Sequence, residues 1–164
     1  MPDLEQNTYS AELFVASQFT YAGWNTYFPQ RDKGFDFIAS KEIDSGEILI
    51  RPVQVKGKYP EDGTTERSRY GYKSKPLSQV HEDMVIAIPF YRDQTSKYPE
   101  MVAYMPRVAL KRNSNQDRCQ PAKLTATGPQ PRSYFKGFFG KRGLKILENP
   151  AWGHKSKEEY PWAG

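Results

Sequence analysis

The chain has 164 residues, a net charge of +5, 37% hydrophobic and 14% aromatic residues; this fits one globular domain with its own core and excludes an intrinsically disordered chain. The single cysteine, Cys119, excludes an internal disulfide framework and is typical of a reducing compartment. No apolar run approaches the roughly 20 residues of a membrane-spanning helix, and the N-terminal residues lack the pattern of a signal peptide, so we expect a cytoplasmic protein without a membrane partner.

The opening part of the chain predicts a helix. Thr8 or Ser10 can cap a helix that ends near residue 22, with Gly23 as the residue after its end. Four residues of this helix share one face at the i, i+3, i+4, i+7 spacing: Glu12, Val15, Ala16 and Phe19. That face should pack on a sheet, which would place a carboxylate at the edge of a buried stripe. Such a carboxylate needs a partner or a metal, unless Glu12 is an ordinary glutamate favoured by the helix dipole.

Three strands are predicted next, over residues 24–28, 34–39 and 48–56. The last two are joined by Asp44-Ser45-Gly46, which is the chemistry of a hairpin turn.

Polar residues interrupt the two strands of this hairpin. Side chains alternate along a strand, so Gln54 and Lys56 should share one face, with Val53 and Val55 on the other. If the hairpin register places Asp36 beside Gln54, then a carboxylate, an amide oxygen and an ammonium group converge on one patch. This patch is a candidate metal-dependent hydrolytic site, and its presence downstream favours the functional interpretation of Glu12.

Asp36, the triplet Gln54-Val55-Lys56 and the preceding helix with Glu12 together resemble the PD-(D/E)XK nuclease superfamily, in its restriction-endonuclease-like and Holliday-junction-resolvase-like branches. The resemblance covers roughly the first third of the chain. Phe35 stands where the family usually has proline, and Gln54 stands where it usually has an acid. The resemblance implies a mixed α/β (α+β) fold with an α-β-β-β-α-β core, a mixed central sheet and a short helix before the fourth core strand. It also implies a catalytic role for Lys56 and a homodimer.

The chemistry of these residues suits Mg²⁺ or Mn²⁺. Such an ion takes oxygen ligands, commonly one or two carboxylates with water and substrate phosphate. Glu12 and Asp36 would supply two negative charges, the Gln54 side chain a neutral oxygen, and Val55 its main-chain carbonyl. Lys56 would orient the attacking water or stabilise the charged transition state. The catalytic set is therefore Glu12, Asp36, Gln54 and Lys56.

The rest of the chain predicts two more strands and a basic extension. Residues 84–91 form a near-continuous apolar run typical of a buried strand, and residues 100–105 read as its partner. Residues 107–112 predict a short helix or a basic turn. Prolines and glycines interrupt the chain after residue 112, so we expect a nuclease-like core over residues 1–112 and an irregular basic and aromatic extension over 113–164, packed on that core.

The charge distribution points to a polyanionic partner. Residues 106–145 contain ten basic residues against one acid, a net charge of +9, which leaves −4 for the rest of the chain. The residues expected to bind nucleic acid are Arg107, Lys111, Arg112, Arg132, Lys136, Lys141 and Arg142. The four neighbouring aromatic residues, Tyr134, Phe135, Phe138 and Phe139, could stack on bases or fill a core. Glycines 137, 140 and 143 would let the backbone approach phosphate closely.

These observations predict a magnesium-dependent endonuclease acting on DNA, and they leave RNA open as a substrate. Two alternatives remain open from the sequence. The neutral amide of Gln54 is also compatible with a catalytically inactive nuclease fold that binds nucleic acid without cutting it. The basic extension alone is compatible with a structural or protein-interaction domain that meets an acidic partner.

Overall fold

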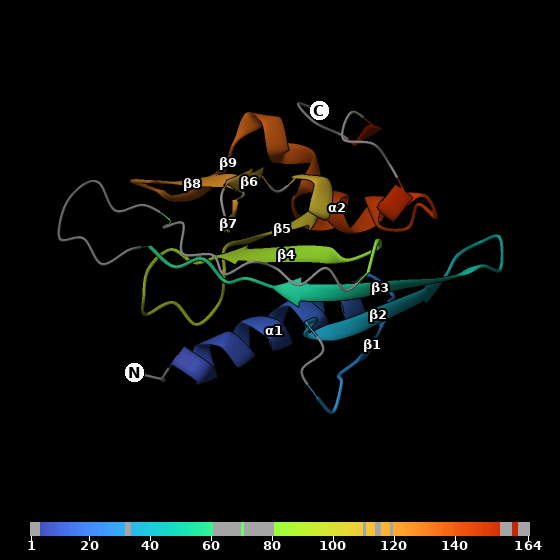
Figure 1. The fold of residues 1–164 in the computed structure, drawn as a ribbon. Helices are drawn as coiled ribbons and strands as arrows, with labels where there is room; N and C mark the ends of the chain where they lie inside the picture. Colours follow the sequence, from blue (N-terminus) through green and yellow to red (C-terminus); the bar gives the residue numbers. More distant parts are fainter. Residues whose placement is uncertain are drawn as a thin grey trace.

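A computed structural model describes residues 4–31, 34–60, 70, 81–109, 111–113, 116–118, 120–154 and 159–160. Its first elements are α1 (Leu4–Tyr21), β1 (Asn25–Tyr27), β2 (Phe37–Glu42), β3 (Ile48–Val55), β4 (Val85–Phe90) and β5 (Met101–Pro106). They form one sheet in the order β1-β2-β3-β4-β5, in which only β3 and β4 run parallel (Figure 1). The expected mixed α+β class with a mixed central sheet is therefore confirmed.

Helix α1 begins earlier than predicted and ends where predicted. Leu4, Glu5 and Gln6 are strong helix formers, which favours the earlier start. Gly23 follows the end of the helix with φ of 88°, a left-handed conformation that glycine adopts without strain. The buried face consists of Ala11, Val15, Ala16 and Phe19, so Glu12 lies beside this stripe and is half-buried. None of the described helices is long and apolar enough to cross a bilayer.

The hairpin of β2 and β3 forms as predicted. Gly46 has φ of 83°, and its N–H donates to the Ile43 carbonyl at 2.8 Å, which closes the turn. The ladder runs from the Glu42–Ile48 pair to the Phe37–Val53 pair.

One face of this hairpin packs on α1. Phe37 and its partner Val53 are fully buried, and the Phe37 ring meets Phe19 of α1 edge-on, with 5.5 Å between the ring centroids. Because side chains alternate along a strand, Gln54 and Lys56 project to the opposite face from Val53.

Strands β4 and β5 complete the sheet close to their predicted positions. All six residues of β4 are buried, as the apolar run indicated. The short helix that the family resemblance implies before β4 would lie within residues 61–80, and all of these except Tyr70 are outside the described residues.

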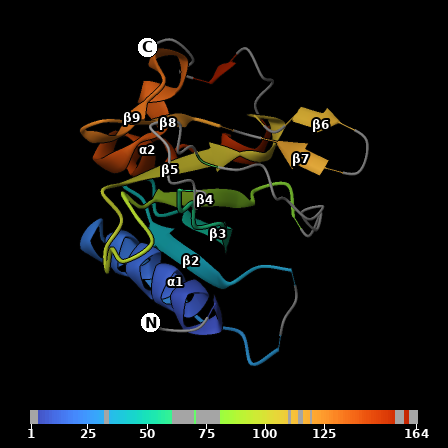
Figure 2. The same ribbon diagram turned by 90° about the vertical axis from the view of Figure 1, so that its left-hand side faces the viewer.

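The chain after β5 is more regular than predicted. It contains η1 (Arg107–Ala109), β6 (Lys111–Asn113), β7 (Gln116–Arg118), β8 (Ala122–Thr125), β9 (Gly128–Pro131), η2 (Ser133–Phe138), α2 (Gly140–Ile146) and η3 (Trp152–His154). The strands pair as two hairpins, β6 with β7 and β8 with β9. These elements lie beyond β5, away from β2 (Figures 1 and 2). Tyr104 of β5 and Leu144 of α2 belong to the same hydrophobic cluster.

Helix α2 approaches β5 closely because residue 143 is glycine. A Cβ at Gly143 would lie 2.1 Å from the Phe138 carbonyl oxygen and 3.0 Å from the Tyr104 ring. Gly143 therefore serves internal packing, and the expectation that it approaches phosphate is wrong for this residue.

Phe138 is fully buried, so it fills the core, whereas Tyr134 is 46% exposed.

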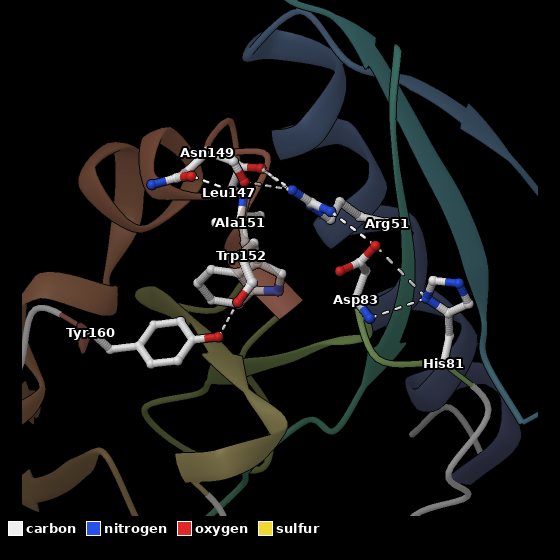
Figure 3. A network of polar contacts seen from close by, with 8 residues as sticks. All are labelled: Arg51, His81, Asp83, Leu147, Asn149, Ala151, Trp152 and Tyr160. Atoms are coloured by element: carbon white, nitrogen blue, oxygen red, sulfur yellow. Dashed lines mark hydrogen bonds and ion pairs between the residues drawn. The ribbon is translucent and has the colours of Figure 1, made fainter. Parts of the chain in front are cut away.

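A buried arginine of β3 forms hydrogen bonds with the segment after α2 (Figure 3). Arg51 is 1% exposed. Its Nε and Nη2 donate to the Leu147 carbonyl at 3.2 and 3.1 Å, and Nη2 also donates to the Asn149 carbonyl at 2.8 Å. Its Nη1 lies 3.4 Å from Asp83 Oδ2. Burial lowers the pKa of Arg51, and the Asp83 carboxylate opposes this shift.

Candidate active site

Asp36 lies where β2 and β3 part. Its N–H donates to the Val53 carbonyl at 2.8 Å, and the paired ladder ends at the Phe37–Val53 pair. The next β3 N–H on this side, that of Val55, donates to Asp36 Oδ2 at 2.6 Å. A strand N–H left without an acceptor costs free energy, so the carboxylate continues the hydrogen bonding that the backbone of β2 no longer supplies. Asp36 is thereby held beside the middle residue of the Gln54-Val55-Lys56 triplet, where the expected register would place it.

The backbone of Val55 is oriented towards this aspartate. The N–H of Lys56 donates to the Ala87 carbonyl of β4 at 2.9 Å, so Lys56 bonds to the other neighbouring strand. The N–H and C=O of one strand residue point to the same side of the strand. The Val55 carbonyl therefore points to the side on which Asp36 lies, as a main-chain ligand would have to.

Gln54 carries an unsatisfied acceptor. The residue is half-buried, and its Oε1 is buried without a hydrogen-bond partner among the residues that the structure describes. Leaving such an acceptor unpaired costs about 1–3 kcal/mol, which is why buried polar atoms normally have partners. A cation, a water molecule or a substrate donor would satisfy it.

Glu12 and Lys56 flank the end of β3 on opposite faces. Lys56 is exposed on the face away from α1. A Cβ on Gly57, the next residue, would lie 3.7 Å from the Ala11 Cβ of α1. The helical turn that contains Glu12 is therefore beside the end of β3, on the face opposite to Lys56. The structure thus joins Asp36 directly to the triplet, and it places Glu12 on a neighbouring element.

The donors at this end of β3 fit a hard divalent cation. Asp36 brings charge, and Gln54 and Val55 bring neutral oxygens, the mixture that Mg²⁺ accepts; Glu12 lies on the α1 face, opposite to the Gln54 side chain. Within the described part of the chain, no three His, Cys, Asp or Glu side chains gather into a metal-binding group; the candidate ligand set has only two residues of these types. The unsatisfied oxygen of Gln54, which adjoins in β3 the residue whose N–H holds Asp36, is the observation that supports the fit.

Two tyrosines beside this site were not predicted from the sequence. The rings of Tyr59 and Tyr91 stack with 4.1 Å between their centroids, and a Cβ on Gly57 would lie 3.6 Å from each ring. Burial raises the pKa of both phenols, so both stay neutral at physiological pH. The sequence separates the two residues, and only the long-range pairing of the Tyr59 segment with the end of β4 brings them together.

The residues predicted to bind nucleic acid have different surroundings. Arg107 is half-buried in η1. Lys111 and Arg112 form part of β6, and their side chains are outside the described part of the structure. The remaining four are exposed: Arg132, Lys136, Lys141 and Arg142.

Neither the search against protein-family models nor the search of curated proteins found a match to this chain.

Proposed function

We propose that the protein is a metal-dependent endonuclease of the PD-(D/E)XK type that hydrolyses DNA phosphodiester bonds. The observation that carries this proposal is the 2.6 Å hydrogen bond from the Val55 N–H to Asp36 Oδ2. It fixes a carboxylate against a strand end whose neighbouring side chains supply an amide oxygen and an ammonium group.

The strand topology supports a restriction-endonuclease-like core. Helix α1 precedes the antiparallel strands β1, β2 and β3, and β4 then runs parallel to β3. A parallel neighbour requires a crossover connection. In this chain the crossover spans residues 56–84, which is long enough for the helix that the resemblance implies.

Each residue of the site would have a distinct task. Asp36, the Gln54 side chain and the Val55 carbonyl would hold Mg²⁺ or Mn²⁺, which when bound would neutralise a phosphate oxygen and acidify a water molecule. Glu12, on the α1 face, would have to approach the ion around the end of β3. Asp36 enters this role already oriented, because the Val55 N–H fixes its rotamer. Lys56 would place its ammonium group next to the attacking water or the developing negative charge.

DNA binding would draw on the exposed cations after β5. Arg132, Lys136, Lys141 and Arg142 are exposed, and such side chains neutralise phosphates with little sequence preference. Cutting both strands of a duplex requires two sites, so we propose a homodimer as the active form.

One observation favours a second function, that of a nuclease fold that binds nucleic acid without cutting it. Gln54 is neutral where the family resemblance leads one to expect an acid, so the site has one negative charge fewer for holding a cation. Salt-dependent DNA binding that is insensitive to a chelator would support this function.

Lys56→Ala provides the test of catalysis. The purified chain with Mg²⁺ should nick or cleave plasmid, branched DNA or RNA, and EDTA should abolish the reaction. Lys56→Ala should lower the rate by on the order of 10²-fold, because the lost cation acts mainly in the transition state. Lys97→Ala, which removes another exposed lysine, should retain the full rate. Intact substrates under all conditions, with the two variants indistinguishable, would refute the proposal.

The basic surface can be tested by the salt dependence of DNA binding. The double substitution Lys136→Ala with Arg142→Ala should reduce the slope of log K against log salt by about 2, since each lost phosphate contact removes about one unit. The control is Arg31→Ala with Lys97→Ala, two exposed cations outside the basic segment. An equal change in both double variants would show that net charge, and not this surface, governs binding.

A further inference from the structure

A cavity of about 500 Å³ lies between α1 and α2 over the sheet. Phe14 and Ala22 line it on the α1 side, Val102 of β5 lies at its base, and Leu144 lines it on the α2 side. Its volume is within the range of about 300–1,000 Å³ that holds small organic ligands. These apolar walls suit a flat, apolar body.

A tyrosine of β5 contributes to the wall of this cavity. Tyr104 lines the cavity and is 1% exposed, and its hydroxyl makes no hydrogen bond with any residue that the structure describes. Burial raises the pKa of Tyr104, which keeps the hydroxyl protonated. A buried hydroxyl of this kind is a donor that a ligand acceptor would satisfy.

The lysines that line the cavity differ in their ion pairing. Lys41 and Lys145 both pair with Glu148, Lys145 at 2.7 Å. Partial burial acts to raise the pKa of Glu148, but the two lysines together outweigh it and lower the pKa. Lys141 also lines the cavity and has no ion pair within the described part of the chain. Lys141 is therefore the cation available to an anionic group.

We propose that this cavity binds a small organic anion, with its planar apolar body between Phe14 and Leu144, an acceptor on the Tyr104 hydroxyl and its acidic group on Lys141. The proposal does not rest on the nuclease function, although Lys141 is also one of the cations proposed to contact DNA. The cavity lies along the C-terminal half of α1, whereas the turn that approaches the end of β3 includes Ala11 in the N-terminal half. A ligand in this cavity would not contact Asp36.

Calorimetric titration of the full chain with 6-hydroxy-2-naphthoate (here naphthoate), which has both a carboxylate and a hydroxyl oxygen as a separate acceptor, and with the neutral 2-naphthol tests the proposal. Naphthoate should bind with one molecule per chain. Lys141→Ala should weaken naphthoate binding by about threefold to tenfold and leave naphthol binding unchanged. Tyr104→Phe, which removes only the hydroxyl, should weaken binding of both compounds by a similar factor.

Matched controls separate this cavity from non-specific adsorption. Lys136→Ala removes an exposed lysine that does not line the cavity, and it should bind naphthoate like the wild-type chain. Asp36→Asn should do the same, with or without Mg²⁺, so that failure of the nuclease proposal leaves this one standing. Absence of naphthoate binding at millimolar concentration would overturn the proposal. So would equal weakening by the Lys141 and Lys136 substitutions.

Discussion

Asp36→Asn should reduce metal-dependent DNA cleavage by on the order of 10²–10³-fold and leave the protein folded, because a fixed charge would be lost and the local hydrogen bond kept. The asparagine oxygen can still accept the Val55 N–H, which now lies 2.6 Å from Asp36 Oδ2. The fold therefore does not depend on the negative charge, whereas the proposed ion does. Cleavage rates and thermal melting of the same preparations measure the two effects.

Two further variants define what this result means. Asp36→Leu should lose activity and also stability, by about 1–3 kcal/mol, because the Val55 N–H is left without its acceptor. Asp93→Asn alters an exposed carboxylate that accepts hydrogen bonds from Thr95 within its own turn, and it should cleave DNA at the normal rate. Full activity in Asp36→Asn would show that the chemistry does not use this carboxylate.

Arg51→Met should destabilise the protein by about 3–5 kcal/mol, the largest stability effect that we expect from one substitution. Arg51 is almost fully buried, and its guanidinium satisfies the carbonyls of Leu147 and Asn149 as well as facing Asp83. Its removal leaves all three groups without this donor. Urea denaturation, read as the free energy of unfolding, measures the effect.

The matched control is Arg92→Met. Arg92 and Glu100 form an ion pair at 3.7 Å, but both side chains are more than one-third exposed. Such pairs contribute about 0–1 kcal/mol, so this variant should remain close to the wild-type stability. The loss of stability in Arg51→Lys should be intermediate between the losses in Arg51→Met and Arg92→Met, because one ammonium group cannot reproduce the several donors of the planar guanidinium. Equal losses in Arg51→Met and Arg92→Met would contradict the stabilising role of the buried arginine.

The sheet could be predicted from local sequence because its signals are strong and short-range. The alternation around Gln54, the Asp-Ser-Gly turn that contains Gly46 and the apolar run before Tyr91 each specify an element without reference to the rest of the chain. The predicted strands accordingly agree with β1 to β5 to within a few residues.

What the sequence did not reveal depends on long-range packing. The glycines around Gly143 suggested an irregular segment, yet helix α2 forms there, and it packs so closely on Phe138 and on Tyr104 of β5 that residue 143 has no room for a Cβ. Arg51 is in phase with Leu49 and Val53 on the buried face of β3, a signal that could have identified it, but its acceptors lie almost a hundred residues further along the chain.

The candidate site was predictable in part. Hairpin register alone places Asp36 beside the Gln54-Val55-Lys56 triplet, and the structure has this contact. The burial of the Gln54 oxygen and the stack of Tyr59 on Tyr91 both depend on how distant segments cover the end of β3. The predicted helical stripe included Glu12, whereas the buried position is Ala11. The other three members of that stripe are buried as predicted, and Glu12 is half-buried at its edge.

Binding of Mn²⁺ to the full chain, followed by electron paramagnetic resonance of the free ion, tests the central claim most directly because it does not require a substrate. We predict a site that binds Mn²⁺, is competed by Mg²⁺, and is weakened by at least about tenfold in Asp36→Asn but not in Asp93→Asn. Absence of a bound ion, or affinity that is equal in the two variants, would contradict the assignment of a metal site to the end of β3.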